Sequence, residues 1–89
     1  MHFEWDERKN SKNITKHGIS FFQAQYVFGD PNRIILEDLK HSQIEKRFYC
    51  IGKIDNDIVT VRFTYRKSIV RIIGAGYSRK GKMIYEEKN

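Results

Sequence analysis

The chain has 89 residues, with 17 Lys and Arg against 11 Asp and Glu, and a formal net charge of +6. This length allows one domain, residues 1–89, with one modest hydrophobic core, and a hydrophobic share of 39% argues against disorder. We expect neither a signal peptide nor a membrane span, because no apolar run approaches the roughly 20 residues that a bilayer requires. The single cysteine, Cys50, excludes an internal disulfide, so we expect a cytoplasmic protein.

The N-terminal part predicts one strand followed by one helix. His2–Trp5 alternates in hydropathy, which is typical of a strand. Asp6 is a suitable N-cap for a helix over Glu7–His17, and Gly18 is a typical residue to end it. This helix has poor intrinsic propensity, and Ile14 is its one clear apolar contact, so packing must supply most of its stability.

A second helix is predicted to begin after Ser20. Ser20 and Gln23 fit a capping box, and Gly29–Pro31 would end the helix. Apolar residues recur at spacings of three and four and would face a sheet: Phe21, Ala24, Val27 and Phe28. The two helices would therefore form a short helical hairpin.

The middle of the chain predicts strands separated by polar segments. Arg33–Leu36 and Phe48–Gly52 are strand candidates, joined by a polar connector at Glu37–Lys46. A turn follows at Lys53–Asp57, and the chain would end in a short helix at Lys80–Glu87. The expected fold is α+β, with two N-terminal helices packed on a mainly antiparallel sheet of four to five strands and a short C-terminal helix.

A β-hairpin is predicted from two strands, Val59–Arg66 and Ile69–Ala75, around a turn at Lys67-Ser68. Alternation directs one set of side chains to an apolar face: Val59, Val61, Phe63 and Tyr65. In this register three pairs lie opposite each other: Tyr65 and Val70, Thr64 and Arg71, Phe63 and Ile72. A shift of one residue would mix the two faces, so the pattern itself favours this register.

The positive charge is concentrated in the last third of the chain. Residues 60–89 contain eight Lys and Arg but only two acidic residues. The second face of the hairpin would collect these cations, with two isoleucines between them: Arg62, Arg66 and Arg71, Ile69 and Ile73. Such a face is suited to RNA, because guanidinium groups bind phosphate oxygens in pairs and aromatic rings stack on unpaired bases. The alternative is a solvated sheet face whose arginines pair with acidic residues.

The sequence offers little for metal or cofactor chemistry. Its three histidines, at positions 2, 17 and 41, form no metal-ligand motif. Gly74–Gly76 fits neither a P-loop nor a dinucleotide-binding motif. We therefore expect no metal and no cofactor. Any catalysis would be acid–base chemistry that uses the RNA 2′-hydroxyl as nucleophile, with cations stabilising the phosphorane.

Several residues are candidates for such a site. Arg66 and Arg79 flank the basic face and are our candidates for phosphate clamps. His17 is of a type that titrates near neutrality, but at a helix end it could instead complement the helix dipole. Glu45 and His41 lie in the connector, and either could be a base or a bystander. We assign contacts with the substrate to six further residues: Lys16, Arg47, Arg62, Arg71, Tyr77 and Lys80.

Six short segments form a series along the chain: FEWDERKN, KHGISF, VFGDP, HSQIEKRFYCIG, a hairpin with TYR and VRII, and YEE. In this order and spacing they resemble the BrnT family of toxins, which belongs to the RelE/ParE-like toxins of bacterial type II toxin–antitoxin modules. The resemblance covers nearly the whole chain. It implies a RelE/ParE-like fold and a metal-independent ribonuclease that inhibits translation. It also implies a BrnA-like ribbon-helix-helix antitoxin, through which the complex would bind DNA and repress its own promoter.

The chain departs from the family at the end of the second hairpin strand. BrnT-like sequences often read I-S-A-R where this chain reads Ile73-Gly74-Ala75-Gly76, so the usual strand-end arginine is Gly76. Arg79 could supply this charge from a different backbone position. Four positions of the family pattern carry over: Glu45, Arg47, Arg66 and Arg71. Two alternatives therefore stand beside the active toxin, namely a catalytically weak binding module for complex formation and promoter control, and a ParE-like gyrase poison.

Overall fold

The computed structural model describes residues 1–89, which form five strands, three α-helices and two 3₁₀ helices. In chain order these are β1 (His2–Trp5), α1 (Glu7–His17), α2 (Phe21–Ala24), η1 (Gln25–Gly29), β2 (Ile34–Glu37), η2 (Leu39–His41), β3 (Arg47–Ile54), β4 (Asp57–Arg66), β5 (Ile69–Gly76) and α3 (Arg79–Lys88). Each predicted helix and strand is present. β3 and β4 are longer than the strands that the sequence predicted there.

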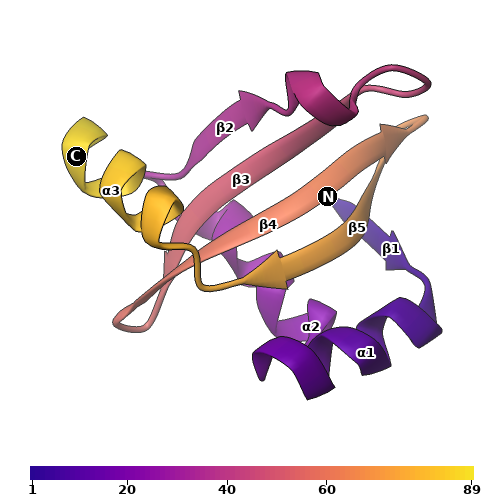
Figure 1. The fold of residues 1–89 in the computed structure, drawn as a ribbon, viewed down its shortest axis with the longest axis horizontal. Helices are drawn as coiled ribbons and strands as arrows, with labels where there is room; N and C mark the ends of the chain where they lie inside the picture. Colours follow the sequence, from indigo (N-terminus) through magenta and orange to yellow (C-terminus); the bar gives the residue numbers. More distant parts are fainter.

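The strands form one mixed sheet in the order β1-β5-β4-β3-β2 (Figure 1). β1 runs parallel to β5, and all other neighbours are antiparallel. The two shortest strands, β1 and β2, form the edges, whereas β3, β4 and β5 follow one another along the chain and form the centre. The α+β class and the five strands agree with the sequence-based expectation.

The hydrophobic core lies between one face of the sheet and the segment that comprises α2 and η1. Phe21 and Val27 of this segment are fully buried against the inward residues of β4, which are equally buried: Val59, Val61 and Phe63. Burying each side chain of this size stabilises a fold by roughly 1.5 to 3 kcal/mol. The alternation of β4 therefore leaves the opposite face of the sheet to polar side chains.

The second helical segment has less α-helix than predicted. Ser20 and Gln23 form the expected capping box, but α2 ends at Ala24 and the chain continues as η1 to Gly29. The predicted apolar residues are nonetheless buried, because a 3₁₀ helix also brings residues three apart to the same side.

The predicted caps of α1 are both present. The Asp6 side chain accepts hydrogen bonds from the backbone N–H groups of Arg8 and Lys9, and these bonds lower the pKa of Asp6. Gly18 ends the helix with a φ of 73°, in the left-handed region that glycine adopts without strain. The caps fix where α1 begins and where His17, its last residue, is presented.

Two asparagines hold α1 against the rest of the fold. Asn10 Oδ1 accepts from the backbone N–H of Phe21 at 2.8 Å. Asn13 Oδ1 accepts from the N–H of Ala75 at 3.2 Å, and its Nδ2 donates to a carbonyl in the following loop at 2.9 Å. Ile14, the predicted apolar contact of this helix, is 45% exposed. That prediction was wrong, because buried side-chain amides fasten this helix instead of an apolar stripe.

The hairpin of β4 and β5 has the predicted register up to a β-bulge. All three predicted pairs are observed, and the turn has two residues. The register then shifts by one residue, so that Phe63 lies opposite Ile72 but Arg62 lies opposite Gly74. Ile73 is the extra residue of the bulge. Simple alternation would have placed Ile73 beside Arg62, and the bulge places a glycine there instead.

The C-terminal helix α3 packs on β3 and β4 at the end of the sheet far from the hairpin turn (Figure 1). Ser78 caps its N-terminus by accepting from the N–H of Gly81. Tyr85 is buried, and its hydroxyl donates to Asp30 Oδ2 at 2.5 Å. The longest helix of the fold has 11 residues, and none combines the length and the apolar composition that crossing a bilayer requires.

Candidate active site

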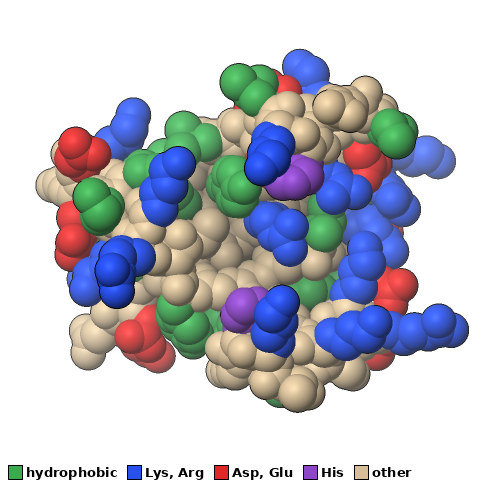
Figure 2. Space-filling view, viewed as in Figure 1, with side chains coloured by type: hydrophobic (Ala, Val, Ile, Leu, Met, Phe, Trp, Pro, Cys, Tyr) green, Lys and Arg blue, Asp and Glu red, His purple; other side chains and the backbone are tan.

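The face of the sheet turned away from the core carries basic side chains, and we call it the open face. It includes Arg47 and Tyr49 of β3, Arg62 of β4, and Arg71 and Gly74 of β5. Figure 2 shows Lys and Arg side chains over this face, a hollow near its middle, and histidine on two sides of the hollow. The face that alternation predicted to be basic is thus also concave.

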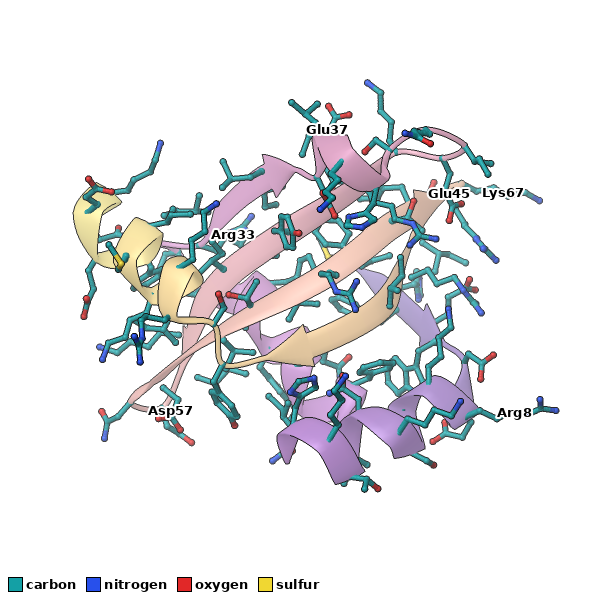
Figure 3. The ribbon with its side chains drawn as sticks, in the orientation of Figure 1. Arg8, Arg33, Glu37, Glu45, Asp57 and Lys67 are labelled. Atoms are coloured by element: carbon teal, nitrogen blue, oxygen red, sulfur yellow. The ribbon has the colours of Figure 1, made fainter.

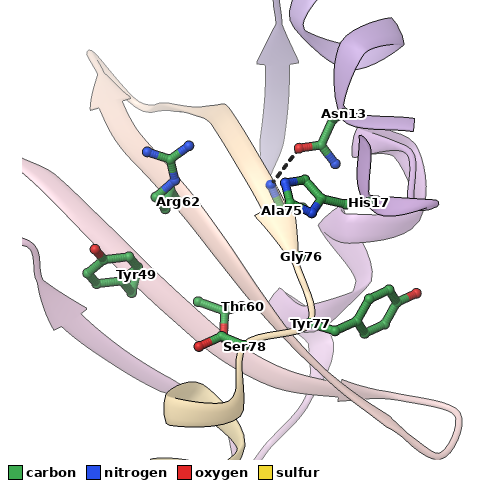
Figure 4. Close-up of a pocket in the computed structure, with 9 residues that line it drawn as sticks. All are labelled: Asn13, His17, Tyr49, Thr60, Arg62, Ala75, Gly76, Tyr77 and Ser78. Atoms are coloured by element: carbon green, nitrogen blue, oxygen red, sulfur yellow. Dashed lines mark hydrogen bonds between the residues drawn. The ribbon is translucent and has the colours of Figure 1, made fainter. Parts of the chain in front are cut away.

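The hollow has a volume of about 260 Å³, and we call it the central hollow. Its walls come from α1, β3, β4, the end of β5 and the loop before α3 (Figure 4). Nine residues line it: Asn13, His17, Tyr49, Thr60, Arg62, Ala75, Gly76, Tyr77 and Ser78. The structure therefore brings three of the predicted site residues together here, namely His17, Arg62 and Tyr77.

Arg62 provides the positive charge of the central hollow. Its guanidinium lies over Gly74, where a Cβ would come within 2.7 Å of Arg62 Nη2. No carboxylate lies within ion-pair distance of Arg62, in contrast to the other arginines of the open face. An exposed and unneutralised guanidinium is available to bind an anion.

His17 lies across the hollow from Arg62, at the end of α1 (Figure 4). Its ring lies over Gly76, where a Cβ would be 3.5 Å from His17 Nδ1. Asn13, one turn earlier, fixes α1 beside β5 through the bond to the Ala75 N–H that Figure 4 marks. Gly76, where the resemblance led us to expect an arginine, therefore lies directly under the imidazole.

The remaining arginines of the open face are paired with carboxylates. Arg47 Nη2 and Arg66 Nε lie 3.7 Å and 3.9 Å from the two oxygens of Glu45. We call Glu45, Arg47 and Arg66 the connector cluster; Figure 3 shows Glu45 at the hairpin end of the sheet. Arg71 Nη1 donates to Glu4 at 2.9 Å. Acidic residues distant in sequence thus neutralise part of the charge that the sequence places in the hairpin.

The other predicted cations surround the central hollow without lining it. Arg79 lines a second hollow of about 390 Å³, which also borders on Tyr77. Lys80 lines a groove between α3 and β3. Lys16 is exposed in the last turn of α1, next to His17. The predicted site residues therefore extend along the open face and its rims instead of meeting at one point.

Sequence reasoning did not find the pair formed by Asp38 and His41. His41 Nδ1 lies 2.8 Å from Asp38 Oδ2, and the Asp38 side chain is only 7% exposed. Burial alone would raise the pKa of Asp38, but the hydrogen bond and charge of His41 hold it below its usual value. Burial and then the charge of Asp38 raise the pKa of Tyr49, which lines the central hollow. In the sequence, the only indication of this pair is that Asp38 and His41 lie three positions apart in the connector.

The structure offers no accessible cysteine nucleophile and no cluster of metal ligands. Cys50 is fully buried, and burial raises the pKa of its thiol to about 12, so the thiolate is not accessible near neutral pH. No three His, Cys, Asp or Glu side chains gather where they could hold a metal ion. The groups that do converge, imidazole, guanidinium and phenol, are suited to proton transfer and to anion binding.

Comparison with protein families gives a match. A family model described as "Ribonuclease toxin, BrnT, of type II toxin-antitoxin system" matches residues 5–81. No curated protein matches the sequence. The matched range runs from the end of β1 to the start of α3 and contains every residue that lines the central hollow.

Proposed function

The chain belongs to the BrnT family of ribonuclease toxins of type II toxin–antitoxin systems, and we propose that it cleaves RNA in the central hollow. The observation that supports this site most directly is the free guanidinium of Arg62 facing the imidazole of His17 across one cavity. Guanidinium binds phosphate oxygens in a fork, and imidazole transfers protons near neutral pH. These are the two functions that RNA cleavage without a metal requires.

The proposed reaction is an intramolecular transfer. The 2′-oxygen attacks the adjacent phosphorus, the bond from phosphorus to the 5′-oxygen breaks, and the products carry a 2′,3′-cyclic phosphate and a 5′-hydroxyl. One proton leaves the 2′-hydroxyl and another reaches the 5′-oxygen. His17 carries out one of these transfers, and Arg62 stabilises the charge that develops on the phosphorane. Stabilisation of this kind contributes about 10² to 10³ in rate per donor.

The RNA strand would extend beyond the central hollow on both sides. Tyr77 is 55% exposed between the central hollow and the second one, where its ring could stack on an unpaired base. Beyond Tyr77, Arg79 would bind a flanking phosphate. Lys80 and Lys16 would bind further phosphates at the rims of the open face. At the other end, Arg66 would exchange its weak contact with Glu45 for a phosphate.

The partner is an antitoxin, as the toxin–antitoxin system implies. We propose that it is a BrnA-like ribbon-helix-helix protein and that DNA is bound only through the complex. An acidic or amphipathic segment of the antitoxin laid over the open face would neutralise Arg62 and exclude RNA. A RelE/ParE-like fold, cytoplasmic location and inhibition of translation complete the proposal.

A second candidate function is a binding module without significant catalysis. The observation that favours it is Gly76, which occupies the position of the family's strand-end arginine. Such a protein would bind the antitoxin and act in promoter control. Its affinity for the antitoxin would not depend on RNA cleavage.

Expression in bacteria tests the proposal against the alternatives. The chain expressed alone should arrest growth and translation, and co-expression of its antitoxin should restore both. The His17→Ala variant should be harmless, whereas Arg8→Ala, changed at an exposed position of α1 that projects away from the sheet (Figure 3), should stay toxic. Harmless expression of the parent chain would favour the binding module, and a DNA-damage response with intact RNA would favour a gyrase poison.

A further inference from the structure

The chemistry proposed for the central hollow needs two proton-transfer groups, and the hollow itself provides one imidazole. We infer that His41, oriented by Asp38, is the general base that takes the proton of the 2′-hydroxyl, which leaves His17 as the acid for the 5′-oxygen. This inference rests on the proposed function. It concerns a residue of the connector that sequence analysis could not separate from a bystander.

The position of Asp38 follows from the sheet. The N–H of Asp38 donates to the carbonyl of Arg47 at 2.7 Å, which continues the β2–β3 ladder by one step. Leu36 faces Tyr49 in this ladder, so two residues further along Asp38 is directed to the same side as Tyr49 and Arg47. That side is the open face. Asp38 is therefore a buried carboxylate at the rim of the surface that contains the central hollow.

The bond between Asp38 and His41 determines which imidazole nitrogen is basic. A carboxylate only accepts hydrogen bonds, so His41 Nδ1 must carry the hydrogen of the 2.8 Å contact. In the neutral ring the free lone pair is then on Nε2. His41 is about half exposed, with a side-chain exposure of 49%, so this nitrogen can be reached by a substrate. A base held in one tautomer by a buried carboxylate is a recurrent arrangement for activating a hydroxyl group.

Further contacts hold this pair in place. The Ser42 hydroxyl donates to the Asp38 carbonyl at 2.6 Å and accepts from the Arg47 N–H at 3.0 Å, which closes the connector around the pair. The charged groups that surround His41 are Asp38, Lys40, Glu45 and Arg47, with the Tyr49 phenol beyond Asp38. Tyr49 lies opposite Arg62 in the β3–β4 ladder. Tyr49 is therefore the residue that lies between the Asp38–His41 pair and the central hollow.

Both protons of the cleavage reaction are accounted for. The 2′-hydroxyl loses its proton to His41 Nε2 as its oxygen bonds to phosphorus, and the protonated His17 gives a proton to the departing 5′-oxygen. Arg62, between the two histidines, would bind the non-bridging oxygens. In keeping with this order, histidine surface lies on both sides of the hollow with cationic side chains between (Figure 2).

The test uses the purified full chain and an oligoribonucleotide with a known cleavage position, together with the same RNA carrying sulfur at the 5′-bridging position. Thiolate leaves without a proton, so sulfur compensates for a missing acid but not for a missing base. His41→Gln should lower cleavage of both RNAs by about 10²-fold or more, whereas His17→Ala should regain rate on the sulfur RNA. His2→Gln, at the remaining histidine, is the matched control and should cleave like the parent.

Asp38→Asn tests the orienting role independently. An amide donates to Nδ1 and so stabilises the wrong tautomer; we expect a loss of about 10²-fold and a shifted pH profile, with the Nδ1–H signal of His41 absent from nitrogen-detected NMR spectra. Because Asp38 is buried, circular dichroism must show that this variant is folded. Parent-like cleavage by His41→Gln, or its rescue by the sulfur RNA, would overturn the inference and leave the ribonuclease intact. A parent chain that cleaves neither RNA would instead overturn the proposed function itself.

Discussion

At the scale of single residues, two glycines shape the central hollow. Gly74 leaves the space that the Arg62 guanidinium occupies, and Gly76 lies under the His17 ring. The two positions differ in the closeness of approach, because an added Cβ would lie 2.7 Å from Arg62 Nη2 at one and 3.5 Å from His17 Nδ1 at the other. Van der Waals contact is possible at the second distance and not at the first.

This difference leads to a prediction for two matched variants. Gly74→Ala should displace the end of the flexible Arg62 side chain and lower RNA cleavage by about 10-fold or more, with unfolding free energy changed by only about 0.5 kcal/mol. Gly76→Ala should keep most of the activity, because its methyl group makes an ordinary contact with His17. Cleavage rates and urea unfolding of both variants check this, and equal activities would show that the position of Arg62 is not important.

At the scale of elements, polar contacts hold the two helices that border the open face. α1 has only one strongly apolar side chain, Ile14, and that side chain is largely exposed. Asn13 is buried and satisfies an N–H of β5 and a carbonyl of the next loop. α1 therefore depends on amide groups, which hydropathy does not reveal, to hold His17 over the sheet.

Replacement of Asn13 tests this account of α1. Asn13→Ala leaves a buried N–H and a buried carbonyl without their partner, and we expect the free energy of unfolding to fall by about 1 to 3 kcal/mol. Ile14→Ala, one position further on, should change it by only about 0.5 kcal/mol. Chemical denaturation measures both values. A larger loss of unfolding free energy in Ile14→Ala than in Asn13→Ala would instead support the apolar contact that the sequence predicted.

The docking of α3 depends on pH through Tyr85 and Asp30. Burial alone would raise the pKa of Asp30, but hydrogen bonds from Tyr85 and from backbone N–H groups hold it below its usual value. The hydrogen bond to Asp30 is also the main reason why the pKa of Tyr85 is raised to about 12. The carboxylate therefore adds stability above its unfolded pKa of about 3.9 that is lost in acid, and the phenol adds stability below about pH 10 that is lost as pH rises toward 12.

Tyr85→Phe should remove both contributions. Near neutral pH the variant should be less stable than the parent by about 1 to 2 kcal/mol, and the difference should shrink below pH 3 and above pH 11. Tyr26→Phe, at a tyrosine that is 58% exposed, is the control and should follow the parent at every pH. Thermal unfolding across this range provides the measurement. A constant difference at all pH values would contradict the coupling.

At the scale of the whole molecule, the sequence was sufficient to predict the helices and strands but not the geometry of the candidate site. Alternation in β4 correctly predicted three residues that face the core, but Tyr65, predicted on the same face, is 48% exposed. The caps at Asp6, Gly18 and Ser20 were correct. The bulge at Ile73 could not be predicted, because it depends on how two strands pair. The pairing of Arg71 with Glu4 joins chain segments that only the fold brings together, and the pairing of Asp38 with His41 depends on the local 3₁₀ turn that the connector adopts.

The same limit explains why the charge pattern was only a partial guide to the candidate site. The sequence places the whole net charge of +6 in the last third of the chain. In the structure, Glu4 and Glu45 come from the first two thirds of the chain; Glu4 pairs with Arg71, and Glu45 is shared by Arg47 and Arg66. Arg62 is left without a partner at the central hollow, although it was not the arginine that the sequence favoured as a phosphate clamp.

The most direct test is cleavage of an oligoribonucleotide by the purified protein in the presence of EDTA. We expect products with a 2′,3′-cyclic phosphate and a 5′-hydroxyl, and a rate that falls about 10²-fold in Arg62→Ala but not in Arg8→Ala. Both arginines are exposed, so neither variant should lose much stability. Unchanged cleavage by Arg62→Ala, or products with a 5′-phosphate that form only with added metal, would contradict the central hollow as the site of reaction.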